Sequence, residues 1–443
     1  MILIEDKYIN KSFAIYGMGK SGLATAKNLK SRKIQLVCWD DDKRKRILLK
    51  KKHIPIEKFW LKKKKIDYIV LSPGINIHSC SIKKFLNKNS SKIITDMDLF
   101  YNSEREKFII AITGTNGKST TCKILEQIFK RAGFQTQLGG NIGMPVLALQ
   151  ELKNKKKIYI IEISSYQLAY SKNFKSKYAA ILNISPDHIE RHKSFSNYTK
   201  SKMKLFSNFS ENFRGYLPAK DDYFKKILSN QENKKINKKN IFFVNEKKAN
   251  NIATKSKNIY FKSDCNKENL SFVLKICKEF NISDKIILNV LKKFNGLSHR
   301  QELFLKSKKF LFVNDSKATT FHASKFALKN FSSVYWILGG EIKKNDSFDL
   351  VNVKKNIVKA YIIGKQCNLF ASKIKDKIPF KISKTLKNAI RDVYHDIFKF
   401  RKKFGTILLS PAAASFDQFK NFEERGDYFK SIIKNNLKYF KYV

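Results

Sequence analysis

A glycine-rich turn directly after an apolar segment carries the clearest chemical signal in this chain. Residues 109–112 read IIAI, and residues 113–120 read TGTNGKST. Glycines let backbone N–H groups approach phosphate oxygens, Lys118 can reach the β and γ phosphates, and the hydroxyl of Ser119 or Thr120 can bind Mg²⁺. Residues 122–132 are expected to form the helix whose N-terminus completes this site. The turn therefore predicts a nucleotide phosphate site, with a chance glycine-rich turn as the alternative.

A second glycine-rich turn lies near the start of the chain. Residues 17–22 read GMGKSG between an expected strand at 13–16 and an expected helix at 22–29. Asp40 and Asp41 end the next expected strand about 20 residues later, as in dinucleotide-binding folds. The spacing suits a dinucleotide and equally suits the pyrophosphate of a UDP-sugar, so both ligands remain open. Ser72 ends another expected strand, 68–71, and could form a further wall of this pocket.

Two polar residues follow apolar strands in the middle of the chain. Glu162 lies among isoleucines in the expected strand 158–163, so its carboxylate needs a partner, which could be Mg²⁺ or a lysine. His188 follows the expected strand 179–184, at the edge where ligand sites of α/β sheets form. It could be a metal ligand or a structural histidine.

Two loops in the last third of the chain also follow expected strands. Residues 314–320 read NDSKATT after the strand 310–313, and residues 410–419 read SPAAASFDQF after Leu408 and Leu409. Small and polar residues that lead into a helix start are typical of a loop that closes on a ligand. Either loop could also be only a cap or a turn.

Strands that alternate with helices along the chain predict an α/β protein built from parallel sheets. At 443 residues, about three domains are expected. We predict an N-terminal Rossmann-like domain at residues 1–98, a central P-loop ATPase-like domain at 99–297 and a C-terminal Rossmann-like domain at 298–443. Residues 209–262 are rich in Lys and Asn and weakly patterned, so their elements are hard to place.

The formal charge of +53 raises the possibility of a nucleic-acid partner, but the distribution of charge argues against it. Only 11 of the 90 basic residues are arginine, and the lysines are dispersed. Arginine is the residue preferred for bidentate phosphate and base recognition. We therefore expect no nucleic-acid partner, although a positive field would attract a small polyanionic substrate.

Other compositional features exclude several further classes. Residues 1–7 include charges, and no apolar run reaches the roughly 18 residues that span a bilayer. The six cysteines form no C-x-x-C pair, so neither a zinc site nor a disulfide framework is indicated. We expect a cytoplasmic monomer without a membrane-inserted segment.

In order along the chain, these motifs resemble the Mur ligase family. The match covers nearly the whole sequence, namely residues 17–22, 114–120, 140–143, 162–165, 187–188, 297–300, 314–319, 339–340 and 410–422. The NDSKAT motif and the later SFDQFKNF stretch resemble the branch of the family that adds D-glutamate. The resemblance implies ATP-driven amide ligation through an acyl phosphate, with UDP-N-acetylmuramoyl-L-alanine and D-glutamate as substrates.

The resemblance also implies a role for each candidate site residue. The expected catalytic residues are Lys118, Glu162, His188, Lys202 and Lys317. The expected ATP-binding residues are Gly114, Thr115, Asn116, Gly117, Lys118, Ser119, Thr120, Asn141, Arg300 and Asp315. The expected substrate-binding residues are Gly17, Met18, Gly19, Lys20, Ser21, Asp40, Ser72, Thr319, Lys343, Ser415 and Phe422. Two Mg²⁺ ions are expected on Ser119, Glu162, His188 and Lys202.

Lys202 would act as a carbamate, the CO₂ adduct that converts an ammonium group into an anionic oxygen ligand. Lys200 and Lys204 are neighbouring candidates for the same modification. Two other protein classes remain as alternatives. A nicotinamide-dependent oxidoreductase would use the 17–22 loop but needs no ATP loop, and a nucleic-acid-dependent ATPase would show a steep dependence on salt.

Overall fold

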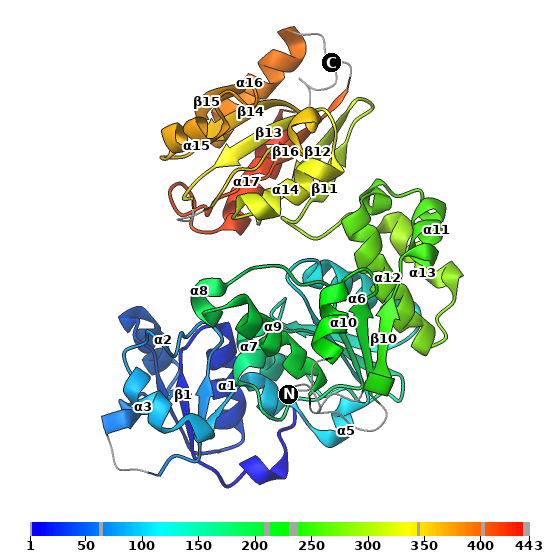
Figure 1. Cartoon of the computed structure of the whole chain (residues 1–443). Coiled ribbons are helices and arrows are strands. Elements are labelled where there is room, and N and C mark those ends of the chain that lie inside the picture. Colours follow the sequence, from blue (N-terminus) through cyan, green and yellow to red (C-terminus); the bar gives the residue numbers. More distant parts are fainter. Residues whose placement is uncertain are drawn as a thin grey trace. The chain divides into compact units, whose positions relative to one another are not determined.

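The computed structural model describes residues 2–61, 65–207, 213–229, 238–342, 346–399 and 404–436. They form two compact units, Met1–Lys257 with Lys267–Lys292, and Asn258–Asn266 with Lys293–Val443. Helices flank a sheet in every part of the chain (Figure 1), which confirms the predicted α/β class. Among the described helices, none has the length and apolarity needed to cross a bilayer.

The first sheet has the strand order β2-β1-β3-β4, and all its strands run parallel. Its strands are β1 (Phe13–Tyr16), β2 (Leu36–Trp39), β3 (Tyr68–Leu71) and β4 (Ile93–Ile94). The helices of this part are α1 (Lys20–Ser31), α2 (Lys43–Lys51) and α3 (Lys83–Lys88). All four residues of β1 are buried, so this strand lies at the centre of the layer.

The second sheet has the order β10-β9-β8-β5-β7-β6 and is also parallel. Its strands are β5 (Ile109–Thr113), β6 (Gln135–Gly140), β7 (Lys157–Glu162), β8 (Tyr178–Ile181), β9 (Arg214–Pro218) and β10 (Ile241–Val244). The helices here are α4 (Asp96–Phe100), α5 (Ser103–Glu106), α6 (Lys118–Arg131), α7 (Ser165–Tyr170), α8 (Ile189–His192), α9 (Phe195–Met203), α10 (Asp222–Ser229), α11 (Lys247–Ser256), α12 (Asp264–Glu279) and α13 (Asp284–Lys293).

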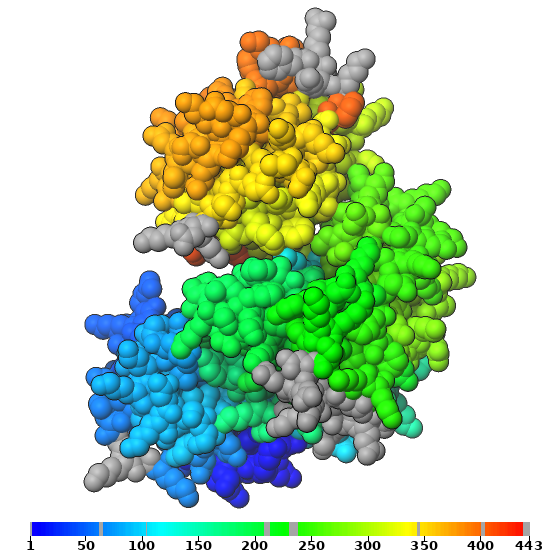
Figure 2. All heavy atoms as spheres, in the orientation of Figure 1, coloured from blue at the N-terminus to red at the C-terminus, as the bar shows by residue number. Residues whose placement is uncertain are grey.

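The first and second sheets share one hydrophobic core within the first unit. Ile15 of β1, Met97 of α4 and Ala111 of β5 belong to the same buried cluster. In the space-filling view of Figure 2, the blue N-terminal part and the green central part meet in continuous contact on the visible face. The two glycine-rich turns therefore belong to one packed body.

The third sheet has the order β11-β12-β16-β13-β14-β15. Its strands are β11 (Glu302–Lys306), β12 (Phe310–Asn314), β13 (Val334–Gly339), β14 (Ile357–Ile363), β15 (Phe380–Lys384) and β16 (Gly405–Leu409). The edge strand β11 runs antiparallel to β12, whereas the other pairs are parallel. One face is covered by α14 (Phe321–Asn330) and α15 (Cys367–Ile374), and the other by α16 (Leu386–Lys399) and α17 (Phe422–Asn435).

A short segment far from this sheet in sequence also belongs to the second unit. Asn258 donates a hydrogen bond to the carbonyl of Phe294 at 2.7 Å. The rings of Tyr260 and Phe261 pack against Phe294, with centroids 5.1 and 5.8 Å apart. The chain therefore passes between the units after Lys257, after Asn266 and after Lys292.

The predicted strands at 13–16 and 68–71 agree with β1 and β3 residue for residue. The strand expected at 179–184 is shorter, because β8 ends at Ile181 and the chain then turns toward the 113–120 loop. The helix expected from residue 122 begins at Lys118 instead. In the weakly patterned region the structure contains β9, α10, β10 and α11.

Candidate functional site

The 113–120 loop connects the buried strand β5 to α6, as its composition predicts. Gly117 has φ +80° and is the N-cap of α6, a backbone conformation that glycine adopts without strain. Lys118 is the first residue of the helix, and its Nζ donates to the carbonyls of Gly114 (2.9 Å) and Thr115 (2.8 Å). The lysine thus lies over the turn, beside the N–H groups at the helix N-terminus, as anion binding requires.

Asn183, which was not among the predicted site residues, anchors this loop. Its Oδ1 accepts from the backbone N–H of Asn116 at 2.9 Å, and its Nδ2 donates to the Asn116 carbonyl at 3.2 Å. Thr115 is held as well, since its hydroxyl lies 3.0 Å from the hydroxyl of Tyr198. The residues just beyond β8 therefore fix the loop from the side.

A second unpredicted residue, Asn269 of α12, packs against Gly117. A Cβ atom at Gly117 would overlap the Asn269 side chain, which is only 3 % exposed. No motif surrounds residue 269 in the sequence, so only the tertiary structure brings it to the loop. The glycine at 117 is therefore required both by its left-handed backbone and by this close approach.

Glu162 ends β7 with its carboxylate pointing toward the same loop. It is 1 % exposed, and it accepts hydrogen bonds from Ser119 Oγ (2.6 Å) and Asn141 Nδ2 (2.8 Å). Both donors are neutral, so the charge of this buried carboxylate has no ion pair among its hydrogen-bond partners. One carboxylate and one hydroxyl beside a phosphate loop fit Mg²⁺, which takes few protein ligands together with phosphate and water oxygens.

Lys202 of α9 is the buried member of its group of lysines. It is 1 % exposed, whereas Lys200 and Lys204 are exposed on the same segment. Its Nζ donates to the Gly114 carbonyl at 2.8 Å and lies 4.8 Å from the centre of the Tyr198 ring. Burial, aided by the nearby Lys118 charge, holds the pKa of Lys202 well below its usual range. Burial also lowers the pKa of Lys204, so what distinguishes Lys202 among these three lysines is its nearly complete burial beside the phosphate loop.

Two histidines lie on the short α8 segment next to these groups. His188 has φ +53°, and its ring lies 4.8 Å from the Tyr166 ring and 3.4 Å, Nε2 to Oδ2, from Asp187. His192, which was not predicted, lies within hydrogen-bond distance of Ser165 Oγ (3.0 Å) and Ser201 Oγ (3.3 Å). Burial lowers the pKa of His192 to about 4, so its ring is neutral at pH 7. It links the start of α7 to the residue preceding Lys202.

The 17–22 loop forms a second candidate phosphate site in the first unit. Gly17 has φ +91°, and Ser72 Oγ donates to its carbonyl at 2.5 Å. The N–H of Met18 donates to Asp40 Oδ2 at 2.5 Å. Asp40 is buried and therefore braces this loop, while Gly19 faces open space.

Arg191 connects α8, near the first candidate site, to the loop after Ser72, near the second. The guanidinium of Arg191, on α8, donates to the carbonyl of Pro73 at 3.2 Å and to that of Ile75. The segment that carries His188 therefore contacts the loop that follows Ser72. Within the first unit, α8 and the loop after Ser72 are therefore held in contact through Arg191.

In the second unit, the predicted residues Asp315 and Ser415 follow the carboxyl ends of the parallel strands β12 and β16. Asp315 accepts from Ser410 Oγ (2.7 Å) and from the N–H of Gln301 (3.1 Å), and burial raises the pKa of Asp315 to about 7. Lys317 Nζ lies 4.7 Å from the centre of the Phe422 ring. The second unit also carries the predicted residues Arg300, Thr319 and Ser415, of which Ser415 is buried. Lys343 lies outside the described residues.

Arg425 ties two loops of this unit together. Its guanidinium donates to Ser316 Oγ (3.0 Å), to the Ser316 carbonyl (2.8 Å) and to the Ala413 carbonyl (2.9 Å). The sequence gives no sign of this role, because Arg425 lies within an amphipathic helix. It fixes the 314–320 loop against the 410–419 loop, the two loops predicted to close on a ligand.

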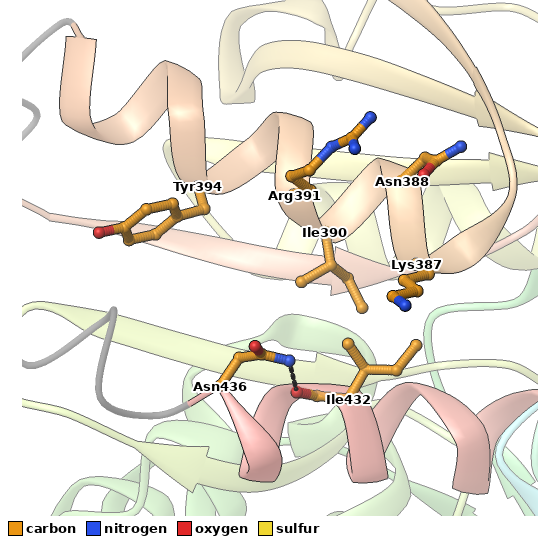
Figure 3. A pocket seen from close by; sticks show the side chains of 7 residues that line it. All are labelled: Lys387, Asn388, Ile390, Arg391, Tyr394, Ile432 and Asn436. Atoms are coloured by element: carbon orange, nitrogen blue, oxygen red, sulfur yellow. Dashed lines mark hydrogen bonds between the residues drawn. The ribbon is translucent and has the colours of Figure 1, made fainter.

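A separate cavity lies between α16 and α17, with a volume of about 370 Å³. Figure 3 shows Ile390 and Ile432 pointing toward one another across it. The other lining residues are Lys387, Asn388, Arg391, Tyr394 and Asn436. None of the predicted site residues lines this cavity, so it is not part of the candidate site.

Known proteins match this chain over nearly its whole length, including the segments that carry both glycine-rich loops. Residues 112–290 match the Mur ligase middle domain. The UDP-N-acetylmuramoylalanine--D-glutamate ligase of Rickettsia bellii is 33% identical over 95% of this chain and 96% of its own length, and that of Bartonella henselae is 32% identical over 96% and 97%. Among solved structures, the MurF ligase of Thermotoga maritima in complex with ADP matches with a TM-score of 0.54 at 13% identity, over 98% of each chain, and so shares the fold.

Proposed function

Since this chain belongs to the Mur ligase family, in its UDP-N-acetylmuramoylalanine--D-glutamate ligase branch, we infer that it joins D-glutamate to UDP-N-acetylmuramoyl-L-alanine in an ATP-driven reaction. The observation that supports this most directly is the convergence of Ser119, Asn141 and Glu162 beside the phosphate loop of Lys118. This arrangement can bind a nucleoside triphosphate and neutralise the charge of its phosphates. The product is a precursor of peptidoglycan.

The reaction has two steps, and negative charge accumulates in both. The substrate carboxylate attacks the γ-phosphate of ATP to give an acyl phosphate and ADP. The amine of D-glutamate then displaces phosphate through a tetrahedral intermediate. Positioned cations and donors are therefore the main catalytic devices.

We propose that the first unit supplies the phosphate and carboxylate contacts. Lys118 would exchange its loop carbonyls for the β and γ phosphates, while Asn141 would donate to the reacting phosphate or acyl group. Gly114–Thr120 would contribute backbone N–H groups, and Ser119 with Glu162 would hold a Mg²⁺ ion. When bound, Mg²⁺ neutralises phosphate charge and polarises the P–O bonds.

We propose that His188 and a carbamate on Lys202 hold a second Mg²⁺ ion. The neutral state favoured for the buried Lys202 amine supports the modification. The loop 17–22, with Asp40 and Ser72 behind it, would hold the uridine diphosphate. In the second unit, Arg300 and Asp315 would contact ATP, Lys317 would stabilise the developing charge, and Thr319, Lys343, Ser415 and Phe422 would bind D-glutamate.

The state of the protein in the cell is part of the same proposal. The ligase would act in the cytoplasm as a monomer, without a nucleic-acid partner or a membrane-inserted segment. ATP and the UDP substrate are polyanions, and the excess of lysines would raise their local concentration. Closure of a site assembled from several domains would limit turnover.

The test is phosphate release by the purified protein with ATP, Mg²⁺, bicarbonate and UDP-N-acetylmuramoyl-L-alanine. D-glutamate, L-glutamate, L-alanine and diaminopimelate are compared as the amino acid. We expect release with D-glutamate alone, together with a product whose mass corresponds to the added residue. Preference for another amino acid would contradict the assignment to the D-glutamate-adding branch. No phosphate release with any of the four amino acids would contradict the proposed ligase activity.

A further inference from the structure

A carboxylate without a hydrogen bond of regular geometry is buried near both candidate phosphate sites. Asp96, the first residue of α4, is 2 % exposed, and neither of its carboxylate oxygens makes a hydrogen bond of regular geometry. Buried polar groups in folded proteins are almost always satisfied, and a buried charge without partners is particularly unfavourable. This residue therefore requires an explanation.

A different carboxylate, that of Asp98, stabilises the start of α4. Asp98 accepts from the N–H of Thr95 at 2.8 Å, which completes the N-terminal cap of α4. Its other oxygen accepts from Ser171 Oγ (2.8 Å) and from the N–H of Lys172 (2.7 Å). Asp98 thus fixes α4 to the end of α7, and the helix does not depend on Asp96.

The polar neighbours of Asp96 come from two functionally distinct elements. Ser21, in the 17–22 loop at the start of α1, and Gln167, on α7 after Glu162, both contact the Asp96 carboxylate and lower its pKa, although neither contact has regular hydrogen-bond geometry. Both side chains are neutral, and the charged neighbour of Asp96 is Asp98. Burial raises the pKa of Asp96 to about 6, so the group is ionised at pH 8.

Gln167 is connected in turn to the residues beside Glu162. Its Oε1 accepts from the N–H of Ser164 at 3.1 Å and from Ser164 Oγ at 3.0 Å. A continuous series of side chains, Ser21, Asp96, Gln167 and Ser164, therefore leads from the 17–22 loop to the turn after Glu162. The contacts of Asp96 with Ser21 and Gln167 are the two in this series without regular hydrogen-bond geometry.

We propose that Asp96 is a positioning residue that couples the UDP-substrate loop to the ATP side of the enzyme. With the UDP substrate bound, Ser21 Oγ and the Gln167 amide donate to the two oxygens of Asp96. Gln167 then holds Ser164 and the turn after Glu162 in the arrangement that receives ATP. This inference rests on the proposed function, because it assumes a UDP substrate at the first loop and ATP at the second.

The experiment measures the coupling between the two ligands in the full chain at pH 8. Isothermal titration gives the affinity for a non-hydrolysable ATP analogue, with and without saturating UDP-N-acetylmuramoyl-L-alanine, for the wild type, Asp96→Asn and Asp96→Ala. We expect the UDP substrate to tighten analogue binding in the wild type by about 10-fold, a typical coupling between sites. We expect little or no tightening in Asp96→Ala and an intermediate value in Asp96→Asn, which keeps one acceptor oxygen.

Thermal melting without ligands separates this role from a structural one. Because the ionised Asp96 is buried beside Asp98 with only irregular contacts to neutral groups, Asp96→Asn should melt without ligands at the same temperature as the wild type or higher. A residue that merely supports the fold would give the opposite pattern, a lower melting temperature with coupling retained. Asp221→Asn is the matched control, since burial also raises the pKa of Asp221, which lies outside this series.

Two outcomes would overturn the proposal. One is a wild type that binds both ligands without coupling, and the other is an Asp96→Ala variant that keeps the full coupling. A wild type that binds neither ligand would instead overturn the proposed function, so the two failures are distinguishable.

Discussion

At the scale of single residues, two lysines donate hydrogen bonds to the same carbonyl group. Lys118 and Lys202 both donate to the Gly114 carbonyl, at 2.9 and 2.8 Å. Two positive charges so close together are unfavourable unless one is neutral or an anion lies between them. Burial holds the pKa of Lys202 well below its usual range, so the neutral form is favoured at Lys202. The proposed carbamate on Lys202 would replace the second cation beside Lys118 by an anion.

Replacing this buried amine should remove activity. For Lys202→Met we expect kcat to fall at least about 100-fold, because a charge-stabilising ligand of the transition state is lost. The wild type should lose activity in CO₂-depleted buffer and regain it with bicarbonate, a response that Lys202→Met should lack. Phosphate release measures both effects. Lys200→Met, an exposed change on the same helix, is the control, and full activity of Lys202→Met would contradict the assignment.

The raised pKa of Asp315 predicts how stability depends on pH. Its folded-state pKa of about 7 exceeds the ordinary value of 3.8, so the folded protein binds the proton more tightly than the unfolded chain. Stability is therefore lost as pH rises from about 4 to 7, by at most about 4 kcal/mol. Asp315→Asn removes this loss.

Calorimetric melting of the wild type and Asp315→Asn at pH 5 and pH 8 measures this effect. The variant should gain stability relative to the wild type at the higher pH. A difference between the two proteins that is the same at both pH values would show that Asp315 does not titrate in this range.

At the scale of elements, the strand-turn-helix unit β5-α6 sets the geometry of the ATP site. Gly117 and Gly133 both have positive φ, +80° and +84°, but only Gly117 is crowded, since nothing lies within 4 Å of a Cβ at Gly133. Gly133→Ala should thus cost about 1–2 kcal/mol for the left-handed backbone alone. Gly117→Ala should cost more, because it also displaces Asn269, and it should weaken ATP binding.

Chemical denaturation and titration with an ATP analogue compare the two variants. Equal losses of stability would mean that the approach of Asn269 to the loop is unimportant. Unchanged nucleotide affinity in Gly117→Ala would contradict the location of the phosphate site.

The elements that sequence predicts well are those with a local signal. The limits of β1 and β3 follow from apolar runs bounded by polar turns, and both loops follow from glycine spacing. The strand β6 was missed because QTQLGG has no apolar pattern, and β7 alone pairs with it. The antiparallel strand β11 was likewise not expected.

The site residues that sequence reasoning missed act over long separations. Asn183 forms hydrogen bonds with Asn116, which lies 67 residues earlier in the sequence. Asn269 and His192 lie in segments without a motif. Lys202 was selected only by resemblance, since a lysine is unremarkable in this composition, and its burial distinguishes it from Lys200. Burial is a property of the packed fold, so no local pattern could supply it.

At the scale of the whole molecule, the positive charge should affect the capture of substrate. Because the UDP substrate and ATP are polyanions, kcat/KM for both should fall about 3- to 10-fold between 50 and 300 mM KCl, as screening increases, while kcat changes little. Steady-state kinetics at several salt concentrations measures this fall. Duplex DNA should not stimulate phosphate release, and stimulation would favour a nucleic-acid-dependent ATPase.

The path of the chain between its two units has a consequence for synthesis on the ribosome. Residues 267–292 complete the first unit before any strand of the third sheet has been translated. Asn258–Asn266, however, is synthesised before the rest of the unit to which it belongs. Tyr260 and Phe261 can therefore pack against Phe294 only after Phe294 has been synthesised. Because domains fold as units during synthesis, the packing of these two aromatic rings stays incomplete on the nascent chain until Phe294 has been translated.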